Sequence, residues 1–206
     1  MKRNSYPGKF IVFEGLDGSG QSTEVRLLTD FLKEKGYRIL KTKEPTKKSE
    51  KAKLIESVLE KKEKLSPREL QDLFSQDRKW HLNNIIIPAL KDGKIVISDR
   101  YFFSSFSYGM AEGLSLEELI ELNNQFLLPD LVFFLDVKPK ICMERVEKRG
   151  EEKTLFEKEE KLRKVYGNYK IVFNRFKELT EIYFIKGERS IEEVFGDIKK
   201  IIYEKF

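Results

Sequence analysis

The segment GLDGSGQST, residues 15–23, constrains the fold of this chain most strongly. It follows the apolar run KFIVFEG, residues 9–15, and precedes a stretch in which apolar residues recur at helical spacing. A glycine-rich turn between a strand and a helix lets backbone N–H groups converge on phosphate oxygens, and the helix dipole favours the negative charge. The pattern therefore predicts a phosphate-binding loop that opens a helix.

One position departs from the usual pattern, because Gln21 stands where a lysine is expected. Glutamine loses the positive charge but keeps two N–H donors. Charged hydrogen bonds contribute about 1.5–3 kcal/mol and neutral ones about 0.5–1.5 kcal/mol, so nucleotide binding should weaken by roughly tenfold. The loss can be larger in a transition state, where charge moves among the phosphates. Two hypotheses follow, namely weakened or compensated catalysis, and a nucleotide-binding protein without catalysis.

Short apolar runs alternate with longer helical stretches along the rest of the chain. The expected strands are 9–15, 37–42, 94–98, 130–137 and 182–185. The expected helices are 19–35, 50–62, 66–90, 139–149 and 157–179, and Pro88 is expected to bend or end the third of them. Two more helices begin at the capping boxes Ser115 to Glu118 and Ser190 to Glu193. This order predicts an α/β fold of three layers, with a mainly parallel five-stranded sheet and helices on both faces. Ligands of such sheets bind at the carboxyl ends of the strands.

Length and charge narrow the class of protein. A chain of 206 residues without repeats or a flexible linker is expected to form one domain, residues 1–206. The net charge of +5 and pI near 9.0 raise the hypothesis of a nucleic-acid binder. Charges of both signs are interspersed, however, which favours a locally positive cleft for a phosphate-rich small molecule over nucleic acid.

The rare residues exclude several classes of site. Cys142 is the only cysteine, which rules out an internal disulfide, suggests a small core residue and fits a reducing cytoplasm. His81 is the only histidine, which disfavours histidine metal sites and Ser-His nucleophiles. The apolar run 10–13 is too short for a signal peptide or a membrane span, so no membrane partner is expected.

Several polar residues follow expected strands or share a helix face. Ser22 is placed to bind Mg²⁺ and Thr23 to help at the phosphates. Asp99 and Arg100 follow the strand 94–98, where the carboxylate can hold Mg²⁺ through water and the guanidinium can grip a phosphate. Lys43 follows another strand and is a weaker candidate for a second phosphate.

Phe74 and Arg78 lie four residues apart on an expected helix and therefore share a face. A planar base could stack on the ring while the guanidinium bonds its edge. A phenylalanine in such a helix is more often a core residue, so this pair alone does not predict a base site.

Taken together, these motifs resemble the thymidylate kinases, which are nucleoside monophosphate kinases with a P-loop NTPase fold. The resemblance covers nearly the whole chain. It rests on FIVFEGLDGSGQST, TKEPT, LFSQDR, VISDRYFFSSFSYG, LPDLVFFLDV and LFEKEE. LFSQDR and the segment from DRY to SYG are the most specific motifs, and they separate this family from adenylate kinases.

The resemblance implies ATP-dependent phosphorylation of dTMP to dTDP, a step of dTTP synthesis, with Mg²⁺. It assigns the ATP phosphates to the loop residues Gly15, Leu16, Asp17, Gly18, Ser19, Gly20, Gln21, Ser22 and Thr23. It assigns dTMP to Asp17, Lys43, Glu44, Phe74, Arg78, Arg100, Ser104 and Tyr108. The implied metal ligands are Ser22 and Asp99, and the implied catalytic residues are Asp17, Gln21, Arg100, Arg149 and Lys153.

The resemblance also implies a lid over ATP at about 149–157 and a homodimer built from helix faces, for which the apolar segment HLNNIIIPAL, residues 81–90, is a candidate. Core packing is the alternative explanation for that segment. The lid carries Lys153 but lacks a second arginine that many members have, and Lys43 replaces an arginine. With Gln21, these departures leave the donor phosphates short of positive charge, which Lys153 or Arg149 is expected to supply. A kinase of another nucleotide or deoxynucleoside remains the alternative enzyme.

Overall fold

The computed structural model describes residues 1–148 and 155–205, and the side chains within these ranges except those of 155–158. The described residues contain a five-stranded sheet in the order β2-β3-β1-β4-β5, and its four strand pairs are parallel. The strands are β1 (Phe10–Gly15), β2 (Ile39–Lys43), β3 (Ile95–Asp99), β4 (Leu131–Asp136) and β5 (Glu181–Lys186). The predicted fold class is therefore confirmed.

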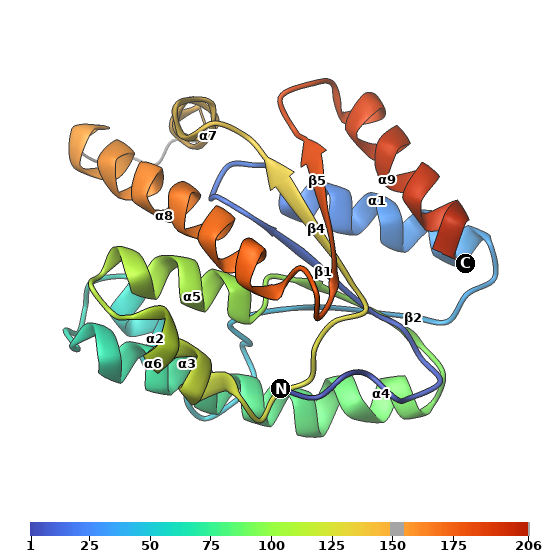
Figure 1. Cartoon of the computed structure of the whole chain (residues 1–206), viewed down its shortest axis with the longest axis horizontal. Helices are drawn as coiled ribbons and strands as arrows, with labels where there is room; N and C mark the ends of the chain where they lie inside the picture. Colours follow the sequence, from blue (N-terminus) through green and yellow to red (C-terminus); the bar gives the residue numbers. More distant parts are fainter. Residues whose placement is uncertain (149–154, 206) are drawn as a thin grey trace.

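Helices cover both faces of the sheet, as Figure 1 shows for α1 and α9 on one side and α5 and α8 on the other. Phe10 and Val12 of β1 pack into one apolar cluster, and Ile11 and Phe13 pack into the other, because successive side chains of a strand point to opposite faces. The helices are α1 (Gln21–Glu34), α2 (Ala52–Leu59), α3 (Pro67–His81), α4 (Ile87–Lys91), α5 (Phe102–Ala111), α6 (Leu116–Asn123), α7 (Pro139–Glu147), α8 (Leu155–Phe176) and α9 (Ile191–Lys205).

The predicted helix starts at serine residues are confirmed. In α3 the Ser66 hydroxyl accepts a hydrogen bond from the Glu69 backbone N–H at 3.3 Å, and the Glu69 carboxylate accepts one from the Ser66 backbone N–H at 2.8 Å. The same reciprocal pair opens α6 at Ser115, and Ser190 makes it before α9. These bonds satisfy backbone N–H groups that a helix start leaves without partners.

The segment 66–90 is not one regular helix, and the interruption lies near Pro88, where the sequence predicts a bend or an end. A π-helical turn, η1 (Leu82–Ile86), separates α3 from α4. Pro88 explains the break, because proline lacks an N–H and its ring clashes with the carbonyl of residue i−4 in a regular helix. Leu82, Ile86 and Leu90 are at most 3% exposed, so these apolar residues pack into the core.

Helix α5 was not predicted. Its aromatic and serine residues are weak helix formers. Phe102, Phe103 and Phe106 are fully buried and contact the Phe176 ring of α8 at centroid distances of 5.6–5.8 Å. Tertiary packing therefore stabilises this helix. None of the described helices is long and apolar enough to cross a membrane.

Replacing Glu24 of α1 with glutamine should stabilise the protein at pH 8. Glu24 is 3% exposed, one carboxylate oxygen has no hydrogen-bond partner among the described residues, and burial raises the pKa of this carboxyl to about 7. Because the pKa is raised in the folded state, this group stabilises the fold at pH values below its unfolded-state pKa. That stabilisation is lost as the pH rises through 7. The gain at pH 8 should be about 1–3 kcal/mol, since each pKa unit corresponds to about 1.4 kcal/mol.

Urea denaturation at pH 8 and pH 5 measures this effect, which should largely disappear at pH 5. Glu34→Gln, at an exposed position of the same helix, is the control and should change stability by less than about 0.5 kcal/mol at both values. An unchanged or lowered stability of Glu24→Gln at pH 8 would contradict the expectation.

Candidate active site

The loop between β1 and α1 is shaped by its glycines. Gly18 and Gly20 have φ angles of +88° and +102°, in the region that favours glycine. A Cβ atom on Gly18 would lie 2.4 Å from the backbone oxygen of Cys142, so a side chain there would collide with α7. The buried Cys142 is a core residue, as predicted.

The loop fits a phosphate group. The Ser19 hydroxyl oxygen is buried and has no hydrogen-bond partner among the described residues. Buried polar groups are normally paired, so this hydroxyl indicates a missing partner. Because the loop ends at the N-terminus of α1, an anion is the favoured partner there.

Gln21 is buried in the first turn of α1, with 6% of its surface exposed. Its amide Nε2 lies 3.5 Å from the backbone oxygen of Phe13 in β1, at the long end of the hydrogen-bond range. This weak contact leaves the amide donors available for a stronger acceptor.

Asp99 joins the phosphate loop to the end of β2. Its Oδ2 accepts a hydrogen bond from the Ser22 hydroxyl at 2.7 Å and lies 3.4 Å from the Lys43 ammonium. Hydroxyl and carboxylate oxygens are ligands that Mg²⁺ prefers, and Mg²⁺ is usually held by one or two protein groups together with phosphates and water. Ser22 and Asp99 could therefore hold Mg²⁺ beside a nucleotide. The described residues contain no cluster of three or more His, Cys, Asp or Glu side chains that would hold a metal by themselves.

Arg100 reaches across the carboxyl ends of the strands in an uncommon backbone conformation. Its φ angle is +73°, and its backbone is held by a bond from its N–H to the Phe13 oxygen at 2.9 Å and one from the Ser98 hydroxyl to its own oxygen at 2.7 Å. Such backbone strain is found mainly at functional sites. The guanidinium donates to the Gly15 backbone oxygen at 3.0 Å and to the Ser104 hydroxyl at 3.0 Å.

Asp17 and Tyr108 complete this cluster. Arg100 donates to the Asp17 carboxylate at 2.7 Å, and the Tyr108 hydroxyl donates to the other carboxylate oxygen at 3.2 Å. Arg100 holds the pKa of the Asp17 carboxyl below its usual value, so this exposed carboxylate is ionised at neutral pH. A guanidinium that binds one carboxylate here can also bind a phosphate, which has similar geometry.

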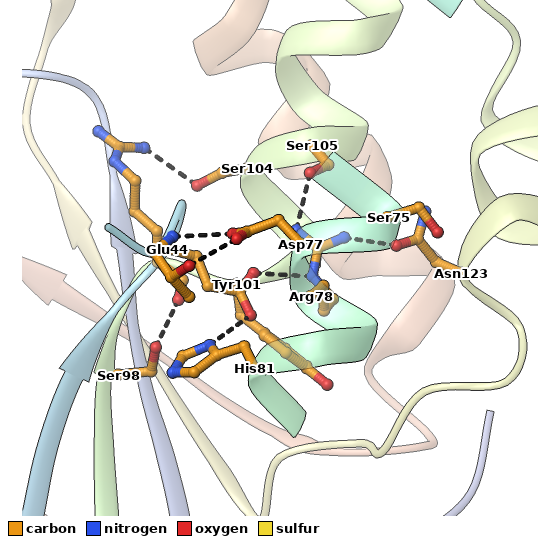
Figure 2. A network of polar contacts seen from close by, with 12 residues as sticks. Glu44, Ser75, Asp77, Arg78, His81, Ser98, Tyr101, Ser104, Ser105 and Asn123 are labelled. Carbon is orange, nitrogen blue, oxygen red and sulfur yellow. Dashed lines mark hydrogen bonds and ion pairs between the residues drawn. The ribbon is translucent and has the colours of Figure 1, made fainter. Parts of the chain in front are cut away.

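A second polar network surrounds Arg78 of α3, as Figure 2 shows. Arg78 is 2% exposed and donates to the Glu44 carboxylate at 2.8 Å. It also donates to Asn123 of α6 at 2.5 Å and to Ser105 of α5 at 2.9 Å. Because a guanidinium has five N–H donors, two remain for a ligand. Phe74 is half-buried one turn before Arg78 on α3.

Comparison of the amino-acid sequence with those of known proteins places this chain in a family. The family model described as thymidylate kinase matches residues 13–198. This chain belongs to the thymidylate kinase family. It is 42% identical to a probable thymidylate kinase of Pyrococcus horikoshii, over 95% of this chain and 96% of that protein. It is 38% identical to the thymidylate kinase of Caldicellulosiruptor saccharolyticus over the same shares of both chains, and 42% identical to a probable thymidylate kinase of Thermococcus onnurineus over 94% and 96%.

Most of the residues assigned by the family resemblance fall into three groups in the structure. Ser22, Lys43 and Asp99 form one contact group, and Asp17, Arg100, Ser104 and Tyr108 form another around the phosphate loop. Glu44 and Arg78 form the third group, a buried ion pair. Arg149 and Lys153, with the first part of the expected lid, lie outside the described residues.

Sequence reasoning missed other polar residues of the site. His81 is buried between Glu44, at 3.0 Å, and the Thr42 hydroxyl, at 2.6 Å. Asp77 is also buried and accepts hydrogen bonds from the Thr46 backbone N–H at 2.8 Å and the Ser49 hydroxyl at 2.5 Å. These bonds fix the loop after β2 onto α3. A signal that could have identified them is that three polar residues, Asp77, Arg78 and His81, lie on one expected helix, with His81 four and three residues after the other two.

Removing the charge of Glu44 should strongly destabilise the fold. In Glu44→Gln, Arg78 keeps a buried charge without a counter-ion, and breaking such a pair costs about 3–5 kcal/mol. Asp92→Asn is the control, because the Arg38–Asp92 pair is exposed to solvent and should contribute little to stability. Urea denaturation measures both values, and equal effects of the two substitutions would contradict the expectation.

Proposed function

We propose that this thymidylate kinase family member transfers the γ-phosphoryl group of ATP to dTMP, giving dTDP. The observation that carries the proposal is the convergence of the phosphate loop with the Arg100 cluster at one edge of the sheet, beside the buried Arg78 and half-buried Phe74. The names of the matching relatives support the same substrate.

The proposed reaction is an in-line displacement without a covalent enzyme intermediate. The acceptor is an anionic phosphate oxygen, so no strong general base is required. Catalysis therefore depends on positioning and on neutralising charge. The phosphate loop binds the donor phosphates, and Arg100 with Lys43 binds the acceptor phosphate. Mg²⁺ held by Ser22 and Asp99 would neutralise charge between the nucleotides.

The base would lie on the Phe74 ring, with the free N–H groups of Arg78 directed to its edge. A carbonyl oxygen can accept these bonds, whereas the amino group of cytosine cannot. Tyr108 and Ser104 lie beside Asp17 and Arg100, near the expected sugar and phosphate. Arg149 and Lys153 are proposed to close over ATP and supply the positive charge that Gln21 lacks.

A coupled ADP-release assay tests this function. The chain with ATP, Mg²⁺ and dTMP should release ADP and form dTDP, with lower efficiency for dUMP, dCMP and thymidine. Gln21→Lys should gain little, because the amide donors and the lid supply the interactions of the usual lysine. ATP binding without dTDP under excess Mg²⁺ would contradict the proposal, and preference for another acceptor would correct the substrate.

We also propose that residues 1–206 act as one domain, in the cytoplasm, as a homodimer. The lone cysteine supports a reducing compartment. The segment 81–90 supports the dimer only weakly, because Leu82, Ile86 and Leu90 pack into the core and only Ile85 and Ile87 are half-buried. Light scattering at micromolar concentration should give twice the mass of the chain, 24.4 kDa, and a monomeric mass would contradict the dimer.

A further inference from the structure

Glu14 is a fully buried carboxylate at the carboxyl end of β1, one residue before the phosphate loop. It accepts hydrogen bonds from the Tyr101 backbone N–H at 2.9 Å, the Ser104 hydroxyl at 2.5 Å and the Tyr169 hydroxyl at 3.0 Å. The first two donors lie at the start of α5, and the third lies on α8. One carboxylate therefore ties together three elements that meet behind the phosphate loop.

Two of these partners also contact Arg100. The Ser104 hydroxyl accepts a hydrogen bond from the Arg100 guanidinium at 3.0 Å, and the Tyr169 hydroxyl lies 3.5 Å from the same nitrogen. Each hydroxyl group that donates a hydrogen bond to Glu14 therefore presents its oxygen to the Arg100 guanidinium. The ionised carboxylate thus sets the direction of both hydroxyl groups.

We propose that Glu14 is a positioning residue that holds the Arg100 guanidinium in its phosphate-binding orientation through Ser104 and Tyr169. This inference rests on the proposed function, in which Arg100 binds the acceptor phosphate. Protonated Glu14 would donate a hydrogen bond to one of the two hydroxyl groups, which would reverse the direction of the hydrogen bonds that lead to Arg100. Arg100 would then lose an acceptor and a nearby negative charge.

The position of Glu14 is unfavourable for stability at neutral pH. Burial raises the pKa of this carboxyl to about 7, although Arg100, Ser104, Tyr169 and Tyr101 oppose the shift. The raised pKa stabilises the fold fully at pH values below the unfolded-state pKa, which is near 4.5. This stabilisation is lost as the pH rises through 7. A neutral isostere should therefore fold at least as well, which a purely structural role would not allow.

The other ionisable groups around Glu14 do not titrate in this range. Arg100 lowers the pKa of the Asp17 carboxyl, and burial raises the pKa values of Tyr101, Tyr108 and Tyr169 above the usual tyrosine range. The phosphate of dTMP itself titrates at about pH 6, so the part of a pH limb near 7 that depends on residue 14 is assigned to Glu14.

Glu14→Gln is the test, and Glu24→Gln is its matched control. Burial raises the pKa of Glu24 to about 7 as well, but among the described residues Glu24 makes no hydrogen bond or ion pair with Arg100. At pH 8, kcat/KM for dTMP should fall by about tenfold or more in Glu14→Gln, the difference between a charged and a neutral hydrogen-bond acceptor. KM for ATP should stay within about twofold, and the melting temperature should not fall. Activity of the wild type and of Glu24→Gln should decline as pH falls through 7, whereas Glu14→Gln should keep only the decline at about pH 6 that protonation of the dTMP phosphate causes.

A second measurement is independent of turnover. The NMR signal of the Arg100 Nε–H group, assigned by its loss in Arg100→Lys, should shift between pH 6 and pH 8 in the wild type and stay constant in Glu14→Gln. Wild-type protein without activity towards dTMP would refute the proposed function but leave this measurement valid. A constant Arg100 signal in the wild type, unchanged kinetics of Glu14→Gln, or activity lost in step with melting temperature would overturn the positioning role.

Discussion

The parallel pairing of β1 with β3 is the constraint on which the rest of the site depends. Phe13 lies opposite Asp99, and the Arg100 backbone N–H extends the pairing to the Phe13 oxygen. This register places the first residues of the phosphate loop beside the Asp99–Arg100 loop. Pairing of β2 with β3 places Lys43 opposite Asp99 in the same way. Because these strands are all parallel, their carboxyl ends lie together at one edge of the sheet.

At that edge the chain accepts several locally unfavourable features together. Arg100 has a positive φ angle, Glu14 is a carboxylate in a fully buried position, and Ser19 has a buried hydroxyl without a described partner. Each of them costs free energy, and the well-packed sheet and helices hold them in place. Such a concentration of strain and buried charge next to a glycine loop is typical of a site organised for phosphate chemistry.

Tyr101 lies between the phosphate cluster and the Arg78 network. Its backbone N–H donates to Glu14, while its ring centre lies 5.3 Å from the Arg78 guanidinium carbon. Ser104 and Ser105, which follow on α5, bond to Arg100 and Arg78 respectively. The start of one helix therefore contributes to both the expected phosphate end and the expected base end of the acceptor site.

Local sequence patterns were enough to predict the strands, most helices, the serine caps and the phosphate loop, because periodicity and capping are properties of a few neighbouring residues. They also placed Asp99 and Arg100 at a strand end. By contrast, the helix over 102–111 and the contact of Glu14 with Tyr169, 155 residues away, arise from the tertiary fold. Those outcomes depend on strand order and on which buried polar groups find partners across the core, and no local pattern encodes either.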